Sequence, residues 1–113
     1  MPAHEIPRQQ WPLFLGNFGY HHFGWDVVLE KKRLGRGERI ADHHFLQELA
    51  TESTGGREQI TIVLGAPFAP HQVHVVEDPK RVRLAPGDEE TLEIDCGRRI
   101  TVVVHVRRAA ASL

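Results

Sequence analysis

Eight histidines give this chain its widest choice of chemistry. Imidazole is a common zinc ligand, and it also serves as a general acid or base near neutral pH. The histidines are His4, His21, His22, His43, His44, His71, His74 and His105. No His-Glu-x-x-His or Cys-x-x-Cys motif gathers them, and in a strand the neighbours His43 and His44 would point to opposite faces. The spacing therefore favours separate surface and loop histidines over a metal site.

A histidine-based metal protein or small hydrolase is nevertheless an alternative, because a fold can bring distant histidines together. Such a site would need His44, His74 and His105 to line one pocket. Convergence of His22 with His44 and His105 would serve as well. We therefore keep His44, His74 and His105 as candidate binding residues, and we predict no metal ion or other cofactor.

The single cysteine, Cys96, could act as a nucleophile beside a histidine. It alternates with Ile94 in an apolar pattern, however, which indicates a buried thiol that behaves as a small hydrophobe. Asp42 precedes two histidines and would suit acid–base chemistry, but an exposed polar loop or strand edge explains it more simply. No serine lies in a Gly-x-Ser-x-Gly context. The sequence thus carries no assembled catalytic motif, and we predict a protein that is not an enzyme.

The 14 basic and 15 acidic residues nearly balance, so net charge gives no drive toward nucleic acid or anionic lipid. Local basic clusters are Lys31-Lys32-Arg33 with Arg36, Arg81 with Arg83, Arg98-Arg99 and Arg107-Arg108. Such clusters occur in single-stranded nucleic-acid binding modules, which also place aromatic residues on the binding face. Here the aromatic residues concentrate near the N-terminus instead. Nucleic-acid binding is therefore an alternative, and solubilising charge at strand ends is favoured.

Phe68 lies in a proline-flanked segment, Gly65-Ala-Pro67-Phe-Ala-Pro70. A phenylalanine in a loop either plugs the core or projects as a contact. If it is exposed, Phe68 is the best candidate in the sequence for contact with a partner.

An aromatic segment from Pro7 to Trp25 organises the predicted fold. Trp11, Phe14, Leu15 and Phe18 follow the spacing of one apolar helical face. Pro12 requires that the helix begin near residue 9 or after a short turn, and Gly19 predicts its end.

The remaining sequence predicts strands that alternate apolar and polar residues. The expected strands are residues 25–32, 38–51, 58–64, 71–77 (which resumes at 81–84 after a bend at Asp78-Pro79), 91–96 and 100–107. Segment 38–51 also tolerates a helical turn, but its place between strands favours a strand, with Ile40, His44 and Leu46 on one face. The predicted class is α+β, a helix packed on an antiparallel sheet of five or six strands. The chain is one domain, 1–113, with an extended lead-in at 1–6 and a frayed tail at 108–113.

Valines also occupy the predicted outer face, namely Val28, Val63, Val76 and Val103. A sheet with one solvated face normally alternates more cleanly. Either a sheet curled into a partial barrel or a homodimer interface would cover this second face.

The first residues lack the basic start and apolar run of a signal peptide, and no apolar run is long enough to span a membrane. One cysteine fits a reducing compartment. We therefore expect a cytoplasmic protein with no membrane partner.

Several motifs resemble a family of small uncharacterised bacterial proteins, a domain of unknown function with an N-terminal Ile-Pro-Arg-x-x-Trp-x-x-Phe signature. The motifs are Glu5-Ile-Pro-Arg8-x-x-Trp11-x-x-Phe14-x-x-x-Phe18, Gly24-Trp25-x-Val27, His74-x-Val-x-x-Pro79-x-x-Val82-x-Leu84 and Leu92-Glu-Ile94. Residues 36–53 depart most from the family pattern. The resemblance implies a small α+β bacterial protein and brings no activity, cofactor or partner. The prediction is a small non-enzymatic binding or accessory protein, homodimeric or with an unknown protein or small-molecule partner.

Overall fold

One helix and eight strands form the part of the chain that the computed structural model describes, which is residues 4–66, 69–85 and 90–108. The strands are β1 (His4–Ile6), β2 (Asp26–Arg33), β3 (Arg36–Thr54), β4 (Arg57–Ala66), β5 (Ala69–Glu77), β6 (Pro79–Ala85), β7 (Glu90–Cys96) and β8 (Ile100–Arg107). A 3-10 turn, η1 (Arg8–Gln10), leads into the helix α1 (Trp11–His21). The predicted α+β class is confirmed, but the predicted count of five or six strands is wrong. β1 is too short to show an alternating pattern, and a sharp corner at Asp78 separates β5 from β6.

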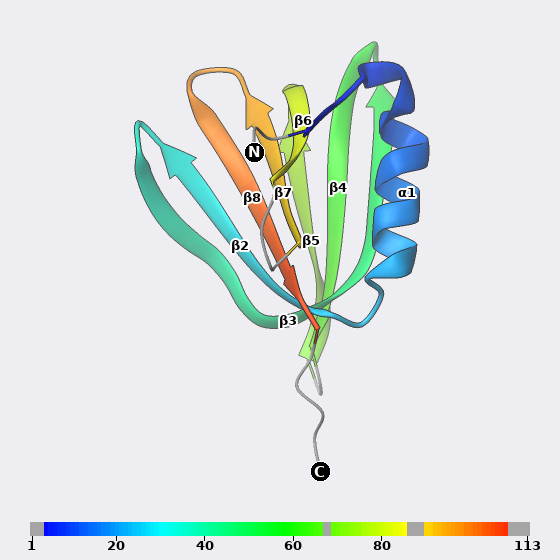
Figure 1. Cartoon of the computed structure of the whole chain (residues 1–113), viewed down its shortest axis with the longest axis vertical. Coiled ribbons are helices and arrows are strands. Elements are labelled where there is room, and N and C mark those ends of the chain that lie inside the picture. The colour runs from blue at the N-terminus through cyan, green and yellow to red at the C-terminus, as the bar shows by residue number, and fades with distance from the viewer. Residues whose placement is uncertain (1–3, 67–68, 86–89, 109–113) are drawn as a thin grey trace.

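All eight strands belong to one sheet in the order β1-β6-β7-β8-β2-β3-β4-β5, with antiparallel neighbours throughout. The sheet is strongly curled, and its strands lie close together near the C-terminal end of β8 and splay apart toward the opposite end (Figure 1). The edge strands β1 and β5 do not pair with each other, so the sheet is not closed into a barrel.

β3 is long enough to pair with β2 along its first part and with β4 along its second part. Its first part pairs with β2, where Glu38 lies opposite Lys31, and its second part pairs with β4, where Leu49 lies opposite Ile62. The predicted strand is confirmed, but the predicted inward face is wrong because Ile40 is exposed and Ala41 is buried instead. Bulges in both pairings shift the alternation, as an extra residue does in any antiparallel ladder.

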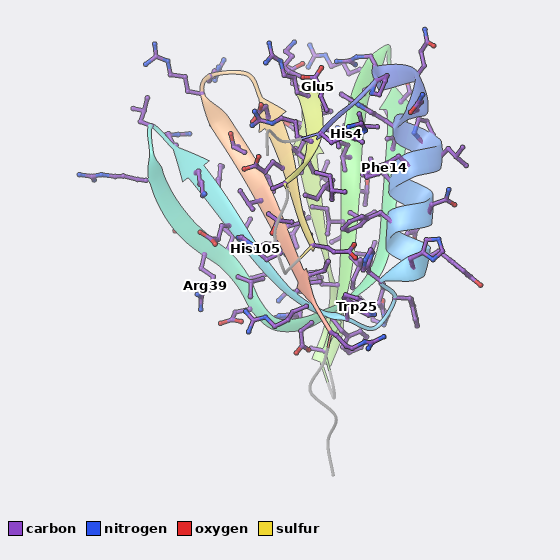
Figure 2. All side chains as sticks on the ribbon, viewed as in Figure 1. His4, Glu5, Phe14, Trp25, Arg39 and His105 are labelled. Carbon is purple, nitrogen blue, oxygen red and sulfur yellow. The ribbon has the colours of Figure 1, made fainter. Side chains whose placement is uncertain are left out.

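α1 packs on β3 through the predicted aromatic face. Trp11, Leu15 and Phe18 are buried, and Phe14 is half-buried on the side that faces the strands (Figure 2). The short turn before the helix is confirmed, and Pro12 sits in the first turn, where no N–H is needed. The predicted end at Gly19 is wrong. The helix continues to His21, and a Cβ at Gly19 would lie 3.1 Å from the Leu49 backbone nitrogen, so this glycine permits close packing on β3.

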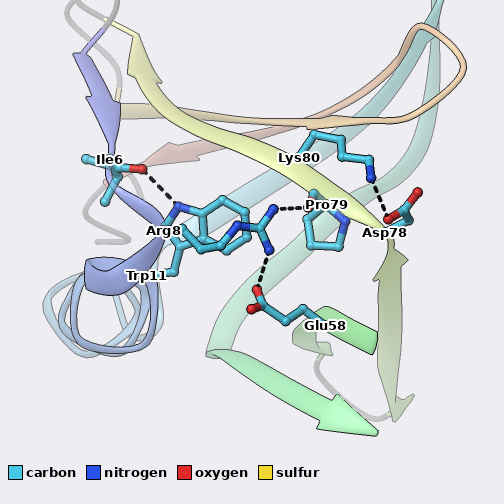
Figure 3. A network of polar contacts seen from close by, with 7 residues as sticks. All are labelled: Ile6, Arg8, Trp11, Glu58, Asp78, Pro79 and Lys80. Atoms are coloured by element: carbon cyan, nitrogen blue, oxygen red, sulfur yellow. Dashed lines mark hydrogen bonds and ion pairs between the residues drawn. The ribbon is translucent and has the colours of Figure 1, made fainter. Parts of the chain in front are cut away.

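Arg8 ties the start of the helix to β4 and β6, each of which lies next to an edge strand of the sheet (Figure 3). Its guanidinium donates to Glu58 Oε2 at 2.9 Å and to the Pro79 carbonyl oxygen at 3.1 Å, and it lies 4.4 Å from the centre of the Trp11 ring. The Trp11 indole N–H in turn donates to the Ile6 carbonyl oxygen at 2.9 Å. Within the predicted extended lead-in, residues 4–6 form β1 and pair with β6. The rest of the predicted tail, residues 109–113, lies outside the described residues.

The inner face of the sheet is apolar, as the alternation predicts. Its buried strand residues include Ile60, Ile62, Leu64, Leu92, Ile94, Val102, Val104 and Val106. The predicted outward position of Val76 is wrong because this residue pairs with Ile60 and is buried with it. Val103 does point outward, between Glu30 and Glu93, and is nevertheless buried.

Candidate functional site

The structure brings only two of the three candidate histidines into one hollow. His44 and His105 line a hollow of about 400 Å³ together with Asp42 and Arg107. His105 Nε2 lies 2.8 Å from Glu30 Oε1, an ion-pair distance without hydrogen-bond geometry, and the His44 ring contacts the Asp42 carbonyl oxygen.

His74 lies on the inner face of β5, opposite Ile62. Partial burial lowers the pKa of His74, and the nearby charge of His44 lowers it further. Among the described residues no group of three or more histidine, cysteine or carboxylate side chains is arranged to hold a metal ion. The metal and hydrolase alternative stays a prediction without a cluster to support it in this part of the chain.

The surroundings of His22 and Cys96 indicate structural roles for both residues. His22 is buried between the rings of Phe18 and Trp25, and it contacts the Phe18 carbonyl oxygen and Glu90. Cys96 is half-buried, and burial, with a smaller contribution from nearby Asp95, raises the pKa of its thiol. Cys96 is therefore a protonated thiol at neutral pH and not an activated nucleophile. Phe68, the predicted partner contact, lies outside the described residues.

A cluster of cations that are distant in the sequence forms at the splayed end of the sheet. The pairing of Arg33 with Ile100 sets the β2–β3 turn beside the β7–β8 turn, and both turns lie at the same end of the molecule in Figure 1. We call this cluster the basic end; it consists of Lys31, Lys32, Arg33, Arg36, Arg98 and Arg99. All six are exposed, and no ion pair among the described residues neutralises any of them.

The basic end concentrates positive charge in a chain that is otherwise acidic. Six of the 14 basic residues lie here, which leaves eight against 15 acidic residues in the rest of the chain. The only acidic residue in the same hairpin turn region is Glu38, which lies opposite Lys31. The near-neutral net charge therefore conceals a strong separation of charge, and the positive end attracts an approaching anion.

Backbone strain gathers at the same place. The four non-glycine residues of the described chain with positive φ are Leu34, Asp78, Arg98 and Arg99, at 52°, 53°, 64° and 59°. Such a conformation costs roughly 1–2 kcal/mol for most residues other than glycine, and strained residues cluster at functional sites. Leu34 is also 69% exposed at the apex of its turn.

Two hollows open at the basic end and share Lys31. The first is a groove of about 430 Å³ between β5 and the β7–β8 hairpin, and the second is a hollow of about 660 Å³ along the β2–β3 turn. Apolar side chains of the groove are Val75, Val76, Cys96, Ile100 and Val102. Its charged residues are Lys31 and Arg98 on one wall and Glu77 and Asp78 on the other, where Asp78 forms an ion pair with Lys80 at 3.1 Å.

The sequence contains every residue of the basic end but does not show that they meet. Two separate clusters, near residues 31–36 and 98–99, come together only because β2 pairs with β8. The Arg33-Leu-Gly-Arg36 turn could have indicated the site in the sequence, because a leucine at the apex of a cationic turn has no role in a core.

No protein-family model, curated protein or solved structure matches this chain. The resemblance to a family of small bacterial proteins therefore stays a prediction. No helix in the described part of the chain has the length and apolar character needed to cross a membrane.

Proposed function

We propose that the protein is a non-enzymatic binding protein that takes an anionic small molecule with an apolar portion at its basic end. The observation that carries this proposal is the set of six exposed cations without carboxylate partners among the described residues, two of which, Lys31 and Arg98, line a partly apolar groove. The ligand's apolar portion would lie against Val76, Ile100 and Val102, and its anionic group would meet Lys31 and Arg98.

The charge of the groove supports an anion more than a cation. Glu77 and Asp78 offset Lys31 and Arg98 locally, but Asp78 already has Lys80 as a partner. Lys31 also lines the adjoining hollow, where Arg33 and Arg36 outnumber Glu38. An anionic group near Lys31 is therefore attracted by both hollows together.

Binding without catalysis fits the chemistry of the same groove. Burial raises the pKa of its thiol, Cys96, and a thiol reacts through its thiolate form. The residues of the groove thus supply an apolar wall and fixed charge and no activated nucleophile.

The proposal is tested by calorimetric titration with octanoate and with the neutral 1-octanol. Each exposed charge contact contributes up to about 1 kcal/mol, so a Lys31→Gln/Arg98→Gln double variant is expected to raise the octanoate Kd about tenfold. Arg81→Gln is the matched control, because Arg81 is an exposed cation that lines neither hollow. Equal binding of octanoate and octanol, or equal loss in the control, would refute the proposal.

Single-stranded nucleic acid is a second candidate that uses the same six cations. Its binding modules stack bases on aromatic side chains, whereas Trp11, Phe18 and Trp25 lie in or against the core here. An oligonucleotide titration separates the candidates, since nucleic-acid binding falls steeply with salt over many phosphate contacts.

A further inference from the structure

The edge strand β5 has the features of an interaction surface. β5 ends the strand order, so one side of its backbone has no neighbouring strand in the described sheet. It spans nine residues, whereas the other edge strand, β1, spans three. Protein sheets usually protect long edges with lysines, bulges or covering loops. Here Val73 and Val75 are 59% and 49% exposed on the outer face of β5.

The sequence of β5 complements itself. In a two-fold antiparallel pairing of two copies of β5, the numbers of any two residues that lie opposite each other have the same sum. This sum is even, because opposite residues point to the same face of the sheet. An axis at His74 sets Val73 opposite the partner's Val75 and His71 opposite the partner's Glu77. An axis at Val75 would instead set Val73 opposite a glutamate, and an axis at Val73 would leave Glu77 opposite an alanine. Only the axis at His74 matches both the apolar and the charged residues.

We propose that two copies of this chain pair through β5 in an antiparallel fashion, with the two-fold axis at His74. The paired valines lie opposite each other on the outer face across the junction, and each end of the junction carries one histidine–glutamate contact. A second copy is the occupant that the self-complementary residues specify, because an unrelated strand has no reason to match both pairs. The pairing and anion binding can be tested separately through Val73 and His74, which line neither hollow of the basic end, whereas Val75 and Glu77 also line the groove.

A disulfide trap tests the register directly. In a Cys96→Ala background, His74→Cys would place two cysteines opposite each other at about 4.5–5.5 Å between Cα atoms, within the range of about 4.4–6.8 Å for a disulfide. Gln72→Cys is the matched control on the same face of the same strand. Its copies would lie four residues out of register, about 14 Å apart. We expect air oxidation to cross-link His74→Cys and not Gln72→Cys.

Sedimentation velocity of the reduced wild-type protein tests the association itself. We expect a dimer at micromolar concentration, and Val73→Lys is expected to raise its dissociation constant at least about tenfold by placing a charge in the apolar junction. Leu13→Lys, at an exposed site on α1, should leave the constant unchanged. A wild-type monomer would overturn the proposal. So would a dimer that Val73→Lys leaves intact, or cross-linking of Gln72→Cys as readily as His74→Cys.

Discussion

Two leucines on α1 allow a sharp test of how the helix sits on the sheet. Leu15 is 0% exposed and Leu13 is 70% exposed, although they lie two residues apart on the same helix. Leu15→Ala removes three carbons from the core at about 0.8 kcal/mol each. With the cavity left behind, the expected loss in the free energy of unfolding is about 3 kcal/mol, within the usual range of about 2–5 kcal/mol. Leu13→Ala should change it by less than about 0.5 kcal/mol.

Urea denaturation followed by circular dichroism measures both variants against the wild type. The two variants share the same chemical change and the same helix propensity change, so their difference isolates burial. We expect the midpoint to fall for Leu15→Ala with an unchanged m-value. Equal losses in the two variants would show that α1 does not pack on β3 through this face.

Further predictions concern close packing and pH. Gly65→Ala should destabilise the fold by about 1–3 kcal/mol, because a Cβ there would lie 2.6 Å from the Phe45 ring. Gly16→Ala on α1, where a Cβ would meet open space, should instead stabilise the fold by about 0.5–1 kcal/mol in thermal or urea unfolding; a loss at Gly16 would contradict this. Burial and then the charge of His44 lower the pKa of His74, so protonation favours the unfolded state and stability is lost as pH falls below about 6.5. His74→Gln should reduce the loss in unfolding free energy between pH 7.5 and pH 5.5, and an unchanged pH profile would count against the partial burial of this ring.

The sequence predicts the elements in which the spacing of apolar residues is uninterrupted. Ile60, Ile62 and Leu64 alternate without interruption in β4 and are all buried as expected. The face of α1 is likewise predicted by the spacing of Trp11 and Phe18.

Long-range pairing explains what the sequence does not anticipate. Ile40 is exposed because bulges in the pairings of β3 change which residues face inward, and a bulge leaves no clear mark in the alternation. The basic end depends on the pairing of β2 with β8, which joins residues such as Arg33 and Ile100. His44 and His105 share a hollow, but His74 does not line it. Residue types suggest candidate sites, whereas strand order and register decide which candidates meet.

Amide NMR of the uniformly labelled protein during titration with octanoate tests the proposed anion site most directly. We expect shift changes that concentrate on Lys31, Ile100 and Val102 and that 1-octanol does not reproduce. Shift changes centred on the hollow beside His44 and His105, or none at all at saturating octanoate, would contradict an anion site at the basic end.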